Sequence, residues 1–63
     1  MKVYIEREDR EVKIKAKTVR ELLKKLNINP ITVLVAKNNE LVTDEVKLSE
    51  KDEVKIISVI SGG

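Results

Sequence analysis

One segment of this chain has the apolar spacing of a helix, and it is surrounded by segments with the spacing of strands. In TVRELLKKL, residues 18–26, apolar side chains recur at positions i, i+3, i+4 and i+7: Val19, Leu22, Leu23 and Leu26. A helix with one apolar stripe must bury that stripe against another element, and the other patterns provide only a sheet. The chain is therefore constrained to a helix that covers one face of a sheet.

Both ends of this helix carry sequence signals. Thr18, followed three residues later by Glu21, forms a capping box. We expect the Thr18 hydroxyl to accept the Glu21 N–H and the Glu21 carboxylate to return to the Thr18 N–H. Asn27 suits a left-handed residue after the helix, and Pro30 prevents the helix from continuing.

The first two strands are predicted from alternation. Residues 1–7 and 11–17 each alternate apolar and polar side chains, and the polar break Glu8–Arg10 separates them. The inward side chains are Val3 and Ile5 in the first run and Val12, Ile14 and Ala16 in the second. Two alternating runs across a short gap predict an antiparallel hairpin.

Further strands follow the helix. Residues 31–37 alternate, with Ile31, Val33 and Val35 on the face toward the helix, and Asn38-Asn39 predicts a turn into a short edge strand at 40–42. Residues 54–60 form the last strand, with Val54, Ile56, Ser58 and Ile60 on one face. Val46 and Leu48 are expected to anchor the polar connection between these strands.

The expected fold is α+β, with four or five strands in a mixed sheet and one helix packed across one face. The chain has no internal repeat and no linker. We expect one domain over residues 1–60, followed by a flexible tail at residues 61–63.

Composition excludes several classes of function. The 63 residues suffice for one small domain with a thin core. The absence of Cys and His removes thiol chemistry, disulfides and the usual proton shuttle near neutral pH, and makes a zinc site very improbable. We therefore expect a binding module, a carrier or a subunit rather than a stand-alone enzyme. We also expect it to be monomeric and to bind no metal or cofactor.

Charge and hydropathy limit the classes of partner that we expect this protein to contact. Thirteen basic and eleven acidic residues are interspersed and give a net charge of +2. Direct nucleic-acid binding would need a basic stripe with stacking aromatic residues, and Tyr4 is the only aromatic residue. No apolar run resembles a signal peptide or reaches the ~20 residues of a membrane span. We expect a cytoplasmic protein that contacts neither membrane nor nucleic acid directly.

The paired carboxylates do not predict catalysis. Asp44–Glu45 and Asp52–Glu53 are adjacent in sequence, and adjacent residues of a strand point to opposite faces. We interpret both pairs as solvated turns rather than an acid–base pair or a metal site.

Four side chains remain on the sheet face that no helix covers. Leu34, Ile57 and Val59 point away from the expected core, and Tyr4 lies on the same side. Exposed apolar patches of this kind often mark contacts between proteins, although single exposed residues are also common. Pattern alone leaves both interpretations open.

The two glycines of the chain are Gly62 and Gly63. Glycine has no side chain, so this pair can pass through a narrow channel in an extended form. A frayed terminus is the alternative interpretation. A projecting glycine carboxylate suits a partner enzyme that activates it as an acyl-adenylate.

Together, these features resemble the ubiquitin-like β-grasp family of sulfur carriers and modifiers, which includes ThiS, MoaD, TtuB and the small archaeal modifier proteins. The segments that carry the resemblance are TVRELLKKLNINPITVLVAKNNELV and LSEKDEVKIISVISGG. The Asn29-Pro30 pair and the ISVISGG ending are most similar to the TtuB and archaeal-modifier branch. Many members have Gly-Asp where this chain has Lys51-Asp52, which leaves the geometry of that turn open.

The resemblance implies a specific function. An E1-like activating enzyme, using ATP and Mg²⁺, would adenylate the Gly63 carboxylate, and a desulfurase or persulfide donor would supply sulfur to give a thiocarboxylate. A thiolase would then use the sulfur for 2-thiouridine in tRNA. Gly62 would give access, Ile60 and Ser61 would line the enzyme's channel, and Leu34, Ile57 and Val59 would face that enzyme.

Other functions are compatible with the same features. The carrier could instead serve thiamin thiazole or molybdopterin synthesis, as ThiS and MoaD do. It could also be attached as a modifier to lysines of target proteins, alone or in addition to sulfur transfer. A non-covalent binding module with incidental glycines is the third alternative.

Overall fold

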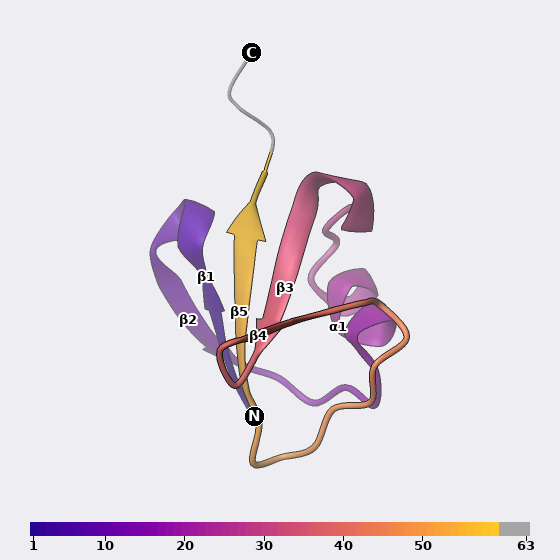
Figure 1. Cartoon of the computed structure of the whole chain (residues 1–63). Helices are drawn as coiled ribbons and strands as arrows, with labels where there is room; N and C mark the ends of the chain where they lie inside the picture. Colours follow the sequence, from indigo (N-terminus) through magenta and orange to yellow (C-terminus); the bar gives the residue numbers. More distant parts are fainter. Residues whose placement is uncertain (60–63) are drawn as a thin grey trace.

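The computed structural model describes residues 1–59 and contains one helix packed against a twisted sheet (Figure 1). Short 3₁₀ turns, labelled η, interrupt the connections. In chain order the elements are β1 (Lys2–Ile5), η1 (Glu6–Glu8), β2 (Arg10–Lys13), α1 (Val19–Lys25), η2 (Pro30–Thr32), β3 (Val33–Lys37), β4 (Glu40–Val42) and β5 (Glu53–Ser58).

The sheet is mixed and has five strands in the order β2-β1-β5-β3-β4. The central strand, β5, runs parallel to β1 and antiparallel to β3, while both hairpins are antiparallel. The predicted α+β architecture, a β-grasp domain with one helix across a mixed sheet, is confirmed.

The core lies between α1 and one face of the sheet. Neighbouring strands contribute pairs of apolar side chains to this core. In the β1–β5 register, Val3 lies opposite Val54 and Ile5 lies opposite Ile56. The buried cluster consists of Val3, Ile5, Val19, Leu22, Leu23, Val35, Val54 and Ile56. None of the buried side chains in residues 1–59 is polar or charged, so burial of aliphatic groups holds the two layers together.

The first hairpin is present, but its boundaries differ from the prediction. The turn is a 3₁₀ helix that ends at Asp9, a left-handed residue with φ of 47° whose N–H donates to the Glu6 carbonyl. Arg10 belongs to β2 rather than to the break, and β2 ends at Lys13. Ile14 and Ala16 nevertheless pack against the core, as their alternation predicted.

Helix α1 begins and ends as its signals predicted, with one correction. The Thr18 hydroxyl accepts the Glu21 N–H at 3.2 Å, but the Glu21 carboxylate accepts the N–H of Lys17, at 3.4 Å, rather than that of Thr18. Thr18 and Lys47 form an isolated β-bridge, whose hydrogen bonds are made by neighbouring residues: the Val19 N–H donates to the Val46 carbonyl and the Leu48 N–H donates to the Lys17 carbonyl. At the other end Asn27 is left-handed, with φ of 58°, and allows the Ile28 N–H to reach the Leu23 carbonyl.

The start of β3 is where the strand prediction was wrong. Ile31 lies in η2 and its side chain is 83% exposed, so it is not part of the core face. Pro30 begins this turn with its fixed φ, and the Asn29 side chain accepts the Ile31 N–H at 3.0 Å. Asn29 and Pro30 therefore favour a 3₁₀ turn despite the apolar alternation, and the strand begins only at Val33.

The second hairpin follows its sequence closely. Lys37 pairs with Glu40 across a two-residue loop in which Asn38 and Asn39 both have positive φ, 51° and 70°. This is the backbone of a type I′ turn, which Asn tolerates better than most residues. Strand β4 lies at the edge of the sheet, as predicted.

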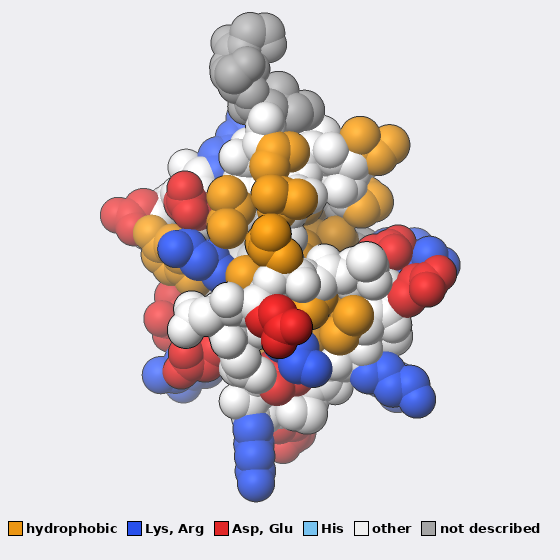
Figure 2. All heavy atoms as spheres, viewed as in Figure 1, with side chains coloured by type: hydrophobic (Ala, Val, Ile, Leu, Met, Phe, Trp, Pro, Cys, Tyr) orange, Lys and Arg blue, Asp and Glu red, His pale blue; other side chains and the backbone are white. Residues whose placement is uncertain are grey.

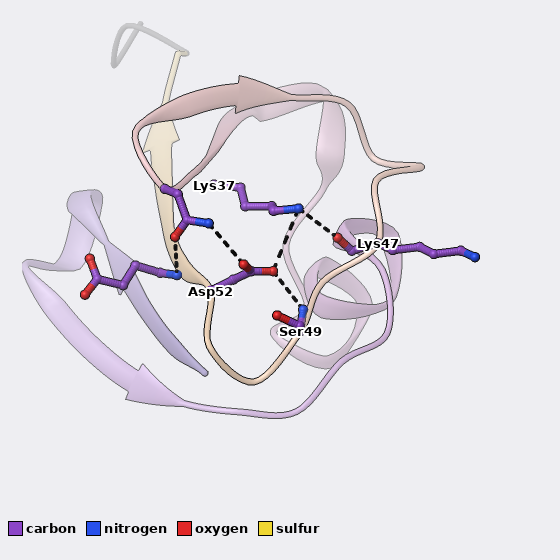
Figure 3. A network of polar contacts seen from close by, with 6 residues as sticks. Lys37, Lys47, Ser49 and Asp52 are labelled. Carbon is purple, nitrogen blue, oxygen red and sulfur yellow. Dashed lines mark hydrogen bonds and ion pairs between the residues drawn. The ribbon is translucent and has the colours of Figure 1, made fainter.

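A polar network fixes the start of β5 (Figure 3). The Asp52 carboxylate accepts the Ser49 N–H at 2.7 Å and the Asn38 amide N–H at 3.0 Å, while the Asn38 oxygen accepts the Glu53 N–H. The Asp52 side chain is only 12% exposed, so the prediction of a solvated turn was wrong for this residue.

The same network settles the Lys51-Asp52 turn. The Asp52 N–H closes the turn on the Ser49 carbonyl at 3.1 Å, and Lys51 does not adopt a positive φ. This turn therefore does not need glycine at position 51. The hydrogen bonds from Ser49, and then Asn38, hold the pKa of the Asp52 carboxyl below its ordinary value.

Candidate functional site

The face of the sheet opposite α1 carries an apolar cluster beside the C-terminal end of β5. Leu34 of β3 lies directly opposite Ile57 of β5, and Val59 follows two residues later. We call Leu34, Ile57 and Val59 the apolar patch. Figure 2 shows hydrophobic side chains gathered over this part of β5.

The side chains of the apolar patch are exposed, while the main chain that carries them is held by hydrogen bonds. Leu34 is 45% exposed and Val59 is 48% exposed, while Ile57 is half-buried between them. The Val59 N–H donates to the Thr32 carbonyl at 3.1 Å, which ties the residue after β5 to the turn before β3. The sheet therefore fixes the positions from which these side chains project.

Leu41 extends this surface and was missed from the sequence. It is 62% exposed and pairs with Ala36, which shares the face of Leu34. The signal was present, because a two-residue Asn38-Asn39 loop fixes the register and hence the direction of Leu41. The apolar surface therefore reaches from β5 to the edge strand β4.

Tyr4 lies on the same face but at a charged border of the patch. It pairs with Lys55, whose ammonium lies over the Tyr4 ring, 5.9 Å from its centroid, and 3.8 Å from the Glu6 carboxylate. The Tyr4 hydroxyl donates to Asp9, and this hydrogen bond raises the pKa of the phenol. Tyr4 thus contributes a polar rim beside the three aliphatic side chains.

The predicted tail residues Ile60, Ser61, Gly62 and Gly63, with the domain boundary at residue 60, lie outside the described residues. Covalent geometry still limits their reach. Gly63 is the fourth residue after Val59, and an extended chain spans at most ~3.6 Å per residue, or about 14 Å in total. Gly63 is therefore tethered close to the apolar patch.

Residues 1–59 contain no cluster of acidic side chains suited to hold a metal ion. In the same part of the chain, no helix is long and apolar enough to cross a membrane. Asp44, of the first predicted carboxylate pair, is joined to Arg20 at 3.1 Å, and Asp52, of the second, belongs to the turn network.

The fold and this surface define a β-grasp module with an apolar sheet face next to its last strand. The sequence matches the ThiS family over residues 3–63, and the chain belongs to that family. It is 40% identical over 57 residues to the sulfur carrier protein TtuB of Thermus thermophilus, covering 89% of this chain and 88% of TtuB. It is also 42% identical over 62 residues to an uncharacterized protein of Archaeoglobus fulgidus, covering 97% of this chain and 90% of that protein. The resemblance identified from the sequence is thus confirmed.

Proposed function

We propose that this chain is a sulfur carrier protein, and that its sulfur is held as a thiocarboxylate on Gly63. The observation that carries the proposal is the ThiS-family match, which extends through Gly62 and Gly63. The similarity to a relative described as a sulfur carrier supports it over most of the chain. In this role the protein is the substrate of other enzymes rather than an enzyme.

The chemistry requires activation of the carboxylate before sulfur can be added. A carboxylate resists nucleophiles, so an E1-like enzyme with ATP and Mg²⁺ would form the Gly63 acyl-adenylate and release pyrophosphate. Sulfide would then attack the carboxyl carbon, displace AMP and leave the thiocarboxylate. A persulfide donor would displace AMP to give an acyl disulfide, and a thiol would reduce this to the thiocarboxylate and be oxidised to a disulfide. Because sulfur resides on the main chain, the absence of cysteine is no obstacle.

The residues before Gly63 would present it to the activating enzyme. Gly62 would admit the chain to a narrow channel because it has no side chain, and Ile60 and Ser61 would line that channel. We propose that the apolar patch docks on the same enzyme. Its exposure and its tether to Gly63 support this assignment.

We propose the acceptor of the sulfur from the relatives that this chain resembles within the family. Similarity to TtuB supports donation, through a thiolase, to 2-thiouridine in tRNA. Delivery to thiamin thiazole is the second candidate, because ThiS gives the matching family its name. The same activated Gly63 could also be joined to lysines of target proteins as a modifier.

An intact-mass measurement tests the carrier chemistry. The protein is incubated with its cognate activating enzyme, ATP, Mg²⁺ and a sulfur donor. We expect a mass increase equal to the replacement of one oxygen by sulfur, and none in a variant that lacks Gly63. Lys24→Ala, on the exposed helix surface, is the matched control and should react normally. An unchanged wild-type mass with an authentic enzyme would contradict the proposal.

A deletion strain separates the acceptors. Loss of 2-thiouridine from tRNA, restored by the wild-type gene but not by the gene lacking the Gly63 codon, would support tRNA thiolation. A requirement for thiamin with normal tRNA would assign the sulfur to thiazole synthesis instead. Isopeptide-linked adducts in lysates of the native host would identify the modifier role.

A further inference from the structure

A groove of about 720 Å³ lies between the start of α1 and the loop before β5. The segment 15–18, which leads from β2 into the helix, forms one wall, and residues 47–50 form the other. The floor is apolar and includes half-buried Met1, Ala16 and Leu48. This surface is separate from the apolar patch, because Met1 precedes β1 at the end of the sheet where the parallel strand β5 begins.

The walls of the groove are held by main-chain hydrogen bonds. The Leu48 N–H donates to the Lys17 carbonyl at 2.8 Å, and the Val19 N–H donates to the Val46 carbonyl at 3.1 Å. The Lys25 ammonium crosses to the Lys15 carbonyl at 2.6 Å. The two walls of the groove are therefore fixed relative to each other by hydrogen bonds, and the groove is part of the folded structure.

The rim of the groove holds the excess positive charge of the protein. Four lysines and two glutamates line it: Lys15, Lys17, Lys25, Lys47, Glu21 and Glu50. With thirteen basic and eleven acidic residues in the whole chain, nine of each sign remain elsewhere. The net charge of +2 is thus concentrated at the groove.

The lysines of the rim differ in their partners. Lys25 lies 3.4 Å from Glu21, and Lys15 lies 4.0 Å from Glu50 in a pair that is almost fully exposed. Within residues 1–59, no carboxylate forms an ion pair with Lys17 or Lys47. These two ammonium groups are available to an incoming ligand.

We propose that this groove binds an acidic, amphipathic peptide segment of a partner protein. Apolar side chains of the segment would occupy the floor, and its carboxylates would meet Lys17 and Lys47. Charge complementarity of this kind steers association and selects the partner. Because the groove is distant from the end of β5, the segment can bind while another protein acts on Gly63.

The lining favours a peptide over a nucleic acid. The floor is aliphatic and offers no aromatic side chain or arginine on which a base could stack. Glu21 and Glu50 at the rim would repel a phosphate backbone but can be accommodated between the separated carboxylates of a peptide.

A peptide-display selection on the full chain tests this inference. The probe is a random-peptide library, selected on the wild-type protein and counter-selected on Lys17→Glu/Lys47→Glu. The control, Arg10→Glu/Lys24→Glu, changes the net charge equally, at exposed residues outside the groove. Thermal melting of both variants verifies that they fold. Selected peptides are then mapped by amide chemical shifts.

We expect enrichment of apolar peptides flanked by Asp or Glu, with shifts confined to Met1, residues 15–21, Lys25 and residues 47–50. The groove variant should bind at least about tenfold more weakly, the control should bind as the wild type does, and affinity should fall with added salt. No enrichment, peptides without acidic residues, or shifts on the apolar patch would overturn the proposal. Groove shifts with a single-stranded RNA oligonucleotide but with no peptide would also overturn it. The outcome is independent of Gly63, so it does not depend on the proposed sulfur chemistry.

Discussion

Replacing Leu34 by alanine should weaken docking on the activating enzyme without changing the chemistry at Gly63. Leu34 belongs to the apolar patch and lies opposite Ile57, and the pairing of β3 with β5 fixes its main chain. If the patch binds the enzyme, the exposed part of this side chain is removed from water in the complex. The effect should therefore appear in the concentration of carrier that the enzyme requires.

The exposed fraction of Leu34 determines how much binding free energy the substitution should remove. Complete burial of a leucine side chain contributes about 1.5–3 kcal/mol. Since 45% of Leu34 is still exposed, burial of the remainder contributes about 0.7–1.4 kcal/mol to binding. This free energy corresponds to a rise of about three- to tenfold in KM, because about 1.4 kcal/mol is a factor of ten.

The assay is ATP–pyrophosphate exchange by the cognate enzyme at varied concentrations of the carrier. We expect KM to rise and kcat to stay unchanged, since the contact contributes to the ground state and the transition state alike. The buried part of Leu34 supports the fold, so melting of the variant must confirm that it is folded at the assay temperature. Lys24→Ala, which also truncates a long exposed side chain, should leave KM unchanged.

Two results would refute this reasoning. An unchanged KM for folded Leu34→Ala would mean that the enzyme does not cover this part of the sheet. A fall in kcat with unchanged KM would mean that Leu34 acts on the position of Gly63 rather than on docking.

Three further predictions concern stability. Thr18→Ala should lower the free energy of unfolding by about 1 kcal/mol and the melting temperature by about 4–8 °C, whereas Thr18→Ser keeps the cap and should melt near the wild type by circular dichroism. The pKa of Asp52 is lower in the folded state than its ordinary value of 3.8, so its contribution to stability is present above that pH and lost as pH falls through the folded pKa. Asp52→Asn should therefore flatten the acid limb of a stability-against-pH curve, and parallel limbs would contradict the network. Leu22→Ala, at a fully buried position, should cost about 2–5 kcal/mol in urea unfolding, and a loss below about 1 kcal/mol would show that the core readily repacks.

The sequence predicted the layers of this fold because periodicity reports burial directly. The helical stripe at Val19, Leu22 and Leu23 and the alternation at Val54 and Ile56 coincide with the buried cluster. Such patterns follow from which side chains leave water, and this is a local property of the sequence.

The errors arose where polar side chains compete with periodicity. Ile31 continues an apolar alternation, yet Asn29 and Pro30 set a 3₁₀ turn there. Glu21 accepts the Lys17 N–H rather than that of Thr18, in a segment that pairs with residues 46–48, which are far away in sequence. Long-range pairings of this kind are not encoded in the spacing of neighbouring residues.

Of the two candidate surfaces, one could be predicted from the sequence and the other could not. The apolar patch was predictable, since a sheet with one helix leaves one face open. The groove was not, because its lysines come from segments 15–25 and 47, which are far apart in sequence and are brought together by long-range pairing such as the bridge between Thr18 and Lys47. In a sequence where charges alternate throughout, a local excess of +2 becomes visible only in three dimensions.

The arrangement also suggests how one small domain can serve several proteins. On the proposed function, sulfur is attached to the main-chain carboxyl, and the surface of the domain would then serve recognition. Val59 of the apolar patch lies within about 14 Å of Gly63 along the chain, so the patch would suit a protein that acts on that residue. The basic groove is at the other end of β5 and can be occupied at the same time. Leu34→Ala and Lys17→Glu/Lys47→Glu should therefore impair different partners. Each variant should weaken binding of its own partner and leave the affinity of the other partner unchanged, because the sites share no contact.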